Sequence, residues 1–121
     1  MKVEHLTAAF IDHRGTIMDI IQEMSVEHVA IFTSKAGSVR GNHYHKESVA
    51  YIFVIEGQFQ IFYRDEHSPA NNVVANTHDL VTVEPLERHS LLALEDSIFL
   101  MLVSGPKGGK QYVSDTVREQ V

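Results

Sequence analysis

Apolar residues along this chain fall into short runs, several of which alternate with polar residues at the two-residue period of a β-strand. The runs are rich in Val, Ile, Phe and Tyr, the residue types that strands favour. They are Thr16–Ile21, Val29–Thr33, Ala50–Ile55, Phe59–Tyr63, Leu80–Val83, His89–Leu94 and Ile98–Val103. No segment shows a helical period of ordinary length, although 113–121 is compatible with a short helix. The pattern predicts an all-β protein.

Turn-forming residues separate these runs at short, regular intervals. Gly, Pro, Asn and Asp gather at 12–15, 35–37 and 68–72, where they favour turns. Short strands at this spacing are typical of a sandwich or barrel rather than a βαβ fold. Glu56-Gly57 and Glu95-Asp96 each join two strong strands, so we predict a hairpin at both places.

The whole chain, 1–121, is expected to form a single domain, because 121 residues suffice for one core and no boundary is visible. Residues 104–110 read Ser-Gly-Pro-Lys-Gly-Gly-Lys, so 104–121 is assigned as a flexible linker and a C-terminal tail. The tail is expected to pack elsewhere, for example on a second subunit. Edge strands and apolar tails favour pairing, so a homodimer is predicted.

The composition limits the classes of partner and metal ligand, and the sequence indicates a cellular compartment. The formal net charge of −6 argues against nucleic acid or an anionic membrane as the main partner, but it leaves an anionic ligand open, because a local Arg or Lys can hold a phosphate on an acidic protein. There is no cysteine, so a transition metal would need His, Asp or Glu ligands. The sequence opens with an acid and a His where a signal peptide has an apolar run, and no apolar run is long enough to span a bilayer. We expect a cytoplasmic protein.

Three of the eight histidines are arranged informatively. His43 and His45 lie two apart on a segment that reads as a strand, so both side chains point to the same face. His89 opens another strand, shortly after Pro85. Three imidazoles that converge inside a small barrel can hold a divalent metal or transfer protons. The other five histidines are expected to be solvated or structural.

This arrangement resembles the cupin superfamily. Its first motif is a Gly, five residues, His-x-His, three or four residues, a Glu, six residues and a Gly; Gly37, His43, His45 and Gly57 fall in place. Its second motif has a Pro followed shortly by a His, which is similar to the segment 85–89, although the usual Gly after the Pro is replaced. The resemblance implies a single-domain cupin β-barrel, a double-stranded β-helix or jelly roll.

One position departs from the cupin pattern. The Glu that serves cupins as a metal ligand falls on Ala50 here, so the nearby Glu47 is the candidate substitute, because strand alternation would give it the same face as His43. The resemblance implies that His43, His45, His89 and Glu47 bind one divalent metal ion (zinc, nickel, iron or manganese). The alternative is a site without metal, in which the histidines perform acid–base chemistry directly.

Two stretches resemble a narrower group of cupins. Residues 33–46 (Thr-Ser-Lys-Ala-Gly-Ser-Val-Arg-Gly-Asn-His-Tyr-His-Lys) are similar to keto-sugar 3,4-isomerases and to the cupin domains of capsular-polysaccharide sugar epimerases. Residues 10–15 (Phe-Ile-Asp-His-Arg-Gly) are similar to the opening of sugar epimerases and isomerases. Both resemblances imply a nucleotide-linked keto sugar as ligand, in polysaccharide or deoxysugar biosynthesis.

Isomerisation or epimerisation next to a carbonyl needs a base, a stabilised enolate and a returned proton. Neutral His suits the base role, so His43 or His45 is the catalytic candidate and the other its partner. Arg14 or Arg40 can hold a diphosphate through its guanidinium. Tyr51, like Tyr63, can contact the substrate and return the proton, whereas Arg88 is expected to be a surface charge.

Two other functions fit the same motifs, because one fold hosts many activities. The first is a metal-dependent, oxygenase-like cupin acting on a small molecule. The second is a sugar-binding or small-ligand-binding cupin without turnover, which the replacement of the family's Glu by Ala50 favours. The two stretches at 10–15 and 33–46 favour the sugar isomerase or epimerase.

Overall fold

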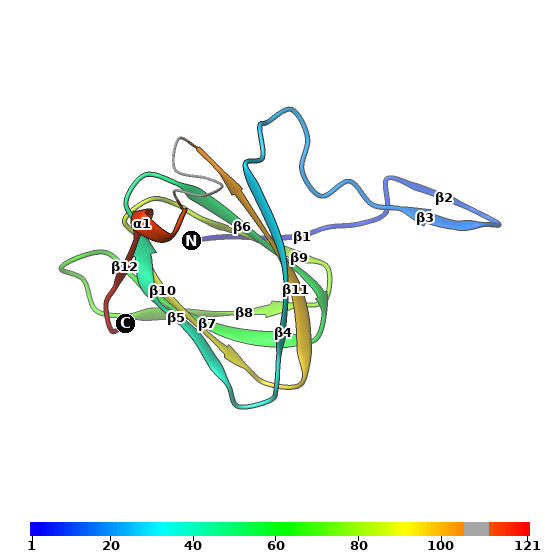
Figure 1. Ribbon diagram of the computed structural model, residues 1–121. Coiled ribbons are helices and arrows are strands. Elements are labelled where there is room, and N and C mark those ends of the chain that lie inside the picture. Colours follow the sequence, from blue (N-terminus) through cyan, green and yellow to red (C-terminus); the bar gives the residue numbers. More distant parts are fainter. Residues whose placement is uncertain (106–111) are drawn as a thin grey trace.

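The computed structural model describes residues 1–105 and 112–121, and nearly all of its regular elements are strands (Figure 1). In chain order they are β1 (Lys2–His5), β2 (Phe10–Asp12), β3 (Gly15–Ile17), β4 (His28–Ser34), β5 (Val39–His45), β6 (Val49–Glu56), β7 (Gln58–Arg64), β8 (Asn71–Asn76), β9 (Asp79–Val83), β10 (Arg88–Ala93), β11 (Ser97–Ser104), α1 (Tyr112–Asp115) and β12 (Thr116–Arg118). In this described part no helix is long and apolar enough to cross a membrane.

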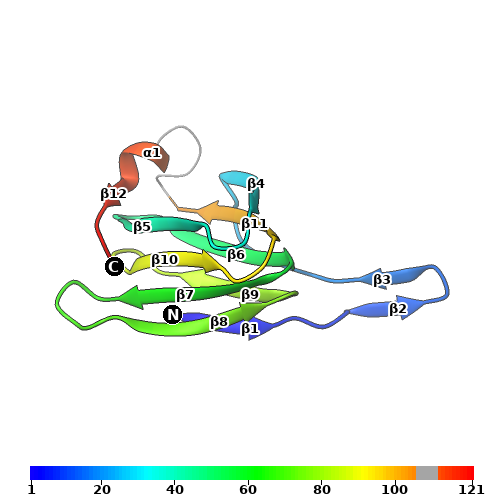
Figure 2. The same cartoon turned by 90° about the horizontal axis from the view of Figure 1, so that it is seen from below.

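Two five-stranded antiparallel sheets face each other and enclose the core (Figure 2). One has the order β1-β9-β6-β11-β4 and the other β12-β5-β10-β7-β8. From β4 to β11 the chain passes back and forth between the sheets, except that β7 and β8 are neighbours in one sheet, and this is the arrangement of a jelly roll. The predicted all-β barrel is confirmed.

The hydrophobic core lies between the sheets and is formed mainly by alternate side chains of β6, β7, β9, β10 and β11. On β11, Phe99, Met101 and Val103 point inward, while the residues between them are only partly covered. Ala50, at the position where cupins carry a Glu, belongs to this core and brings no carboxylate into the barrel.

Both predicted hairpins are wrong. Glu56-Gly57 joins β6 to β7, and Glu95-Asp96 joins β10 to β11, but in each case the two strands belong to different sheets. The short turns are therefore crossovers at one end of the barrel. They also pack together, because a side chain on Gly57 would collide with Ser97, whose Oγ accepts a hydrogen bond of 3.1 Å from the backbone N–H of Gln58. Gly57 is needed for this close approach.

The N-terminal region departs from the barrel after β1. The strand predicted at 16–21 ends at Ile17, because β3 pairs only with β2 in a short two-stranded hairpin. This hairpin projects away from both sheets (Figures 1 and 2). Phe10, Ile11 and Ile17 on it are exposed, so nothing in the described chain covers them.

The C-terminal segment, residues 112–121, packs on its own barrel rather than elsewhere. Its helix is the four residues of α1, and β12 then pairs with the outer edge of β5. The expectation that the tail packs elsewhere is thus corrected for 112–121, where β12 pairs with a distant strand of the same chain. The proposed linker lies largely outside the described residues, since only 104 and 105 of it are described.

Candidate functional site

Strand β5 carries the first two histidines, and a β-bulge sets their position. His43 pairs with His89 on β10, but the next pair is Gly41 with Ser90, so Asn42 is the extra residue. Gly41 and Asn42 both adopt positive φ, of 95° and 55°. A side chain on Gly41 would approach the carbonyl oxygen of His89 to 2.8 Å, so only glycine fits there.

The three predicted histidines come together inside the barrel. Their ring centroids are 4.6 Å (His43–His89), 5.1 Å (His43–His45) and 5.3 Å (His45–His89) apart. One nitrogen from each ring lies within 4.8 Å of the others. His45 and His89 are 1% and 3% exposed, whereas His43 is partly open. The His-x-His spacing and the cross-strand pairing together produce this cluster.

All three imidazoles are held in the neutral form. Burial lowers the pKa of His43 to about 3, and the neighbouring imidazoles and the Arg118 guanidinium lower it further in the same direction. Burial also lowers the pKa of His45 to about 4, although the Asp115 carboxylate opposes the shift. The pKa of His89 is lowered by burial as well. Neutral imidazole is the form that accepts a proton or binds a metal.

Hydrogen bonding fixes the orientation of the third ring. His89 Nδ1 lies 3.0 Å from the Glu87 carbonyl oxygen, which can only accept, so the neutral ring carries its proton on Nδ1. Nε2 of His89 is therefore an acceptor that faces away from the backbone. His43 Nδ1, by contrast, is buried without a hydrogen-bond partner in the described chain. The cluster has unused capacity to bind a ligand or an ion.

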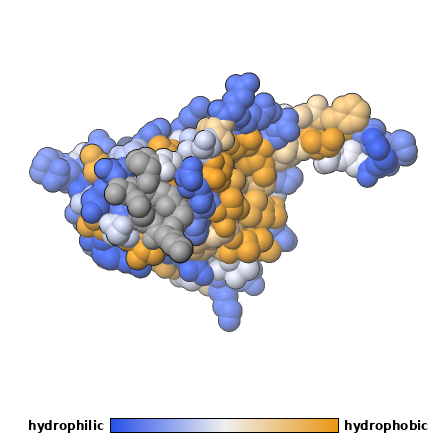
Figure 3. All heavy atoms as spheres, turned by 45° about the horizontal axis from the view of Figure 1, so that its top comes forward, coloured by the Kyte–Doolittle hydropathy of each residue, from blue (hydrophilic) through white to orange (hydrophobic). Residues whose placement is uncertain are grey.

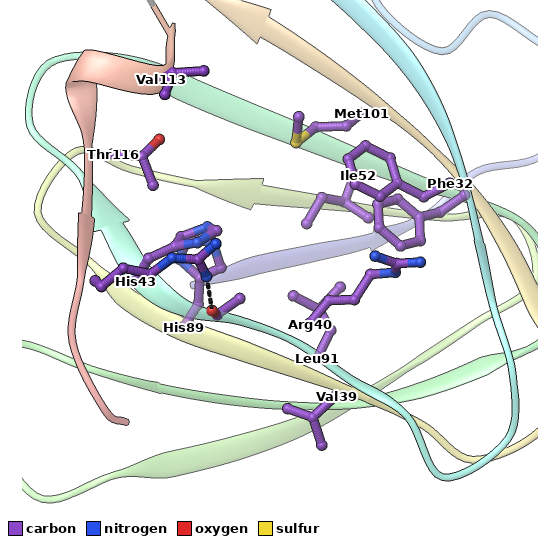
Figure 4. Close-up of a pocket in the computed structure, with 13 residues that line it drawn as sticks. Phe32, Val39, Arg40, His43, Ile52, His89, Leu91, Met101, Val113 and Thr116 are labelled. Carbon is purple, nitrogen blue, oxygen red and sulfur yellow. Dashed lines mark hydrogen bonds between the residues drawn. The ribbon is translucent and has the colours of Figure 1, made fainter.

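A cavity of about 450 Å³ opens beside the cluster, which is a usual size for a small-molecule site. Figure 4 shows His43 and His89 at one end of it, and Arg40 with Phe32 at the other. His43 and His89 line the cavity, whereas His45 does not. The wall between the two ends is apolar and includes Ile52, Leu91 and Met101.

The end opposite the histidines combines aromatic rings with a cation. Phe32 stacks on Phe99 with a centroid separation of 4.7 Å, and the Arg40 guanidinium lies 5.5 Å from the Phe32 ring. Arg40 donates hydrogen bonds to Ser34 Oγ (2.9 Å) and to the Thr33 carbonyl (2.7 Å), both neutral acceptors. Its charge is not neutralised by a carboxylate of the described chain, so it remains available to an anion.

Three of the predicted site residues lie away from this cavity. Glu47 is exposed beyond the end of β5, where strand alternation no longer applies, and among the described residues the ligand cluster consists of the three histidines. Arg14 lies in the projecting hairpin, where its guanidinium binds Asp12 at 2.6 and 3.0 Å. Tyr51 points outward from β6, because its neighbours Ala50 and Ile52 face the core.

Arg88 is also corrected, because it is buried rather than a surface charge. Its guanidinium carbon lies 3.9 Å from the centre of the Tyr44 ring, and its Nε donates to Glu119 at 2.6 Å. The partner is far along the chain, and no local signal marks it. Tyr63 pairs with His89 across β7 and β10, but neither Tyr51 nor Tyr63 is among the residues that line the cavity.

Sequence reasoning missed the contribution of the C-terminal segment. Val113, Thr116 and Arg118 all line the cavity, and Figure 4 shows Val113 and Thr116 next to the histidine end. Thr116 pairs with His45 and Arg118 with His43 across β12 and β5. The alternation in Thr116-Val117-Arg118 is too short to reveal such a strand.

The chain matches known proteins in fold and in family. Among solved structures it is similar to the sugar 3,4-ketoisomerase QdtA from Thermoanaerobacterium thermosaccharolyticum in complex with TDP (TM-score 0.79, 16% identity, covering 98% of this chain and 87% of that one). It is also similar to dTDP-4-dehydrorhamnose 3,5-epimerase from Sulfolobus tokodaii (TM-score 0.69, 24% identity, 85% and 69% covered). These likenesses establish the cupin jelly-roll fold.

A third similar structure is the capsular polysaccharide assembling protein CapF from Staphylococcus aureus, with a TM-score of 0.68 and 22% identity. The match covers 96% of this chain but 34% of CapF, so the chain spans about a third of that protein's length. No curated protein sequence matches significantly. A family model described as the polysaccharide biosynthesis C-terminal domain matches residues 10–111, which is most of the chain. The protein therefore belongs to the polysaccharide biosynthesis C-terminal domain family and has a cupin fold.

Proposed function

We propose that this protein moves a proton next to the carbonyl of a nucleotide-linked keto sugar, as an isomerase or epimerase. The observation that carries the proposal is the cluster of neutral imidazoles at one end of a cavity whose other end holds Arg40, which is hydrogen-bonded to the neutral acceptors Ser34 and Thr33. The similar structures named above include a ketoisomerase and an epimerase of such sugars. A base and an anion site in one cavity match the two ends of this substrate class.

In this mechanism His43 is the base, because it lines the cavity while His45 is buried behind it. The C–H bond next to the carbonyl breaks, its proton goes to His43, and the electron pair moves onto the carbonyl oxygen to give an enolate. Return of a proton at the neighbouring carbon isomerises the sugar, and return at the opposite face epimerises it. His89 Nε2 can accept a hydrogen bond from the protonated cluster and stabilise it.

The same cluster fits a divalent metal ion as a second candidate. His43, His45 and His89 would hold the ion, since neutral imidazole nitrogens within 4.8 Å of one another need only small ring movements to reach Zn–N distances of about 2.0–2.1 Å. A bound ion would polarise the sugar carbonyl. Glu47 is not proposed as a ligand, because it lies outside the cluster.

A homodimer is proposed from the outer face of the sheet that contains β4. Val29 and Ile31 on this edge strand are 59% and 66% exposed, and their cross-strand partners are Leu102 and Leu100. Figure 3 shows a continuous hydrophobic area on the barrel that extends toward the projecting hairpin. Strands that are apolar on both faces need cover on both. A second copy, bringing the same apolar surface, supplies that cover.

The test of the proposed reaction is deuterium exchange. The protein is incubated in deuterated water with dTDP-4-keto-6-deoxyglucose and with other 4-keto nucleotide-sugars, and proton NMR follows each carbon-bound proton next to the keto group. We expect loss of one such signal during incubation with protein and none without it. Exchange absent with every sugar, while thermal-shift assays still show binding, would replace the enzyme by a sugar-binding protein.

A further inference from the structure

Two of the five arginines differ from the rest in how their charge is balanced. Arg14 pairs with Asp12, while Arg64 and Arg88 share Glu119. Arg40 and Arg118 both line the cavity, and within residues 1–105 and 112–121 neither lies within 4.0 Å of a carboxylate. On a protein of net charge −6, the two arginines of the described residues that lack a carboxylate partner are the two that line the cavity.

The β-bulge explains how Arg118 reaches the histidine end. Arg118 pairs with His43 across β12 and β5, and its Nη1 donates a 3.0 Å hydrogen bond to the Gly41 carbonyl. That bond uses one of the five N–H donors of the guanidinium, so the others remain for a ligand.

The segment that carries Arg118 is fastened at both ends. Before it, the buried Asp115 carboxylate accepts hydrogen bonds from the backbone N–H groups of Glu47 and Ser48, each 3.0 Å long. After it, Glu119 binds Arg88, and its backbone N–H donates to the Asn42 carbonyl at 2.9 Å. Such anchoring holds β12 in a fixed position against β5, which is what a preorganised electrostatic contact requires.

Arg40 and Arg118 serve different ends of the cavity. Figure 4 shows Arg40 beside Phe32, across the cavity from His43. Arg118 instead belongs to the strand that pairs with the His43 segment. A ligand with a diphosphate near Arg40 would therefore extend its sugar toward the part of the cavity that His43 and Arg118 line.

We propose that Arg118 stabilises the enolate oxygen that forms when His43 removes the proton from the keto sugar, an assignment that rests on the proposed function. The electron pair of the broken C–H bond moves to the carbonyl oxygen, and the guanidinium donates hydrogen bonds to it. The negative oxygen then lies between two cations, protonated His43 and Arg118. The carbonyl oxygen gains its full negative charge only as the C–H bond breaks, so Arg118 attracts it more strongly in the transition state than in the bound substrate.

The test separates rate from affinity in four variants. Arg118→Gln should lower the deuterium-exchange rate at saturating sugar roughly 10²–10³-fold, as loss of an oxyanion donor does, and change the Kd for thymidine diphosphate less than about threefold. Arg118→Lys should recover part of the rate. Arg40→Gln should instead raise the Kd for thymidine diphosphate about tenfold and leave the exchange rate at saturating sugar nearly unchanged. Lys2→Gln, which removes an exposed charge paired with Glu4 outside the cavity, should change neither.

Three results would overturn the assignment. The first is an Arg118→Gln variant, folded by its thermal melting, that exchanges as fast as the wild type. The second is an Arg118→Gln variant that loses thymidine diphosphate affinity while its saturated exchange rate is unchanged, because Arg118 would then be a phosphate ligand. The third is a wild type that shows no exchange, which removes the proposed reaction together with this role, whereas the first two leave that reaction intact.

Discussion

The two stretches that resemble sugar-modifying enzymes, residues 10–15 and 33–46, differ in where they lie relative to the barrel. Strand β5 is part of the barrel wall, where His43 pairs with His89 on β10 and Arg40 lines the cavity. The β2–β3 hairpin leaves the barrel, and its Arg14 is neutralised by Asp12. The two stretches therefore have different structural roles: β5 carries part of the cavity, whereas the exposed apolar residues of the hairpin are covered by nothing in residues 1–105 and 112–121.

The glycines of the two regions test this contrast most strongly. Gly41 and Gly15 both have positive φ, but a side chain would meet the His89 carbonyl oxygen at 2.8 Å in the first case and nothing within 4 Å in the second. Gly15→Ala should cost only backbone strain of about 1–3 kcal/mol, while Gly41→Ala adds a collision and should cost more. Urea unfolding of both variants measures the difference. Equal losses would mean that the bulge does not position the site as described.

The exposed apolar residues of the β2–β3 hairpin and of β4 predict that a charge placed on β4 weakens the proposed dimer. Ile31→Glu places a charge on the outer face of β4, where it is 66% exposed in the monomer and should not disturb the fold. In a symmetric dimer the substitution enters the interface twice, so the dimer Kd should rise roughly 10²-fold. Light scattering over a concentration series measures this. A wild-type protein that is monomeric at tens of micromolar would contradict the dimer.

Charge removal in the two regions should have unequal effects on ligand affinity. Arg14→Gln should leave the Kd for thymidine diphosphate within twofold of wild type, against about a tenfold increase for Arg40→Gln, because only Arg40 lines the cavity. Isothermal titration calorimetry measures both. A larger effect at Arg14 would show that a second chain brings its hairpin to the site.

The smallest effect concerns pH. The pKa of His43 is about 3 in the folded protein, against about 6.5 in an unfolded chain. As the pH falls below 6.5, the unfolded state binds protons that the folded state does not, so stability decreases toward pH 4. His43→Gln should weaken this dependence between pH 7.5 and 5.0, measured by urea unfolding with a chelator present. An unchanged dependence would mean that His43 is not held neutral.

The sequence predicted the histidine cluster because its signal is local. His43 and His45 share a face by simple alternation, and the motif at 85–89 supplies the third ring. Glu47 was wrong as a site residue because β5 ends at His45, so alternation does not continue to it. The predicted hairpin at 56–57 failed for a related reason: a two-residue turn looks the same whether the chain stays in its sheet or crosses to the other.

The residues that could not be predicted depend on contacts between distant segments. Arg88 is buried and forms a hydrogen bond with Glu119, 31 residues away, and nothing in the sequence around it distinguishes it from a surface arginine. Arg118 reaches the site only because β12 pairs with a strand about seventy residues earlier, through a bulge that no local pattern reveals. Local periodicity predicted most of the strands, but the part of the cavity that β12 lines depends on the pairing of β12 with β5.

The most direct test compares His43→Ala with His45→Ala in the deuterium-exchange experiment on a 4-keto nucleotide-sugar. His43 lines the cavity and His45 is buried behind it, so His43→Ala should lower the exchange rate roughly 10²–10⁴-fold and His45→Ala should lower it less. Both variants are checked for folding by thermal melting. Exchange as fast in His43→Ala as in wild type would contradict the assignment of the catalytic base.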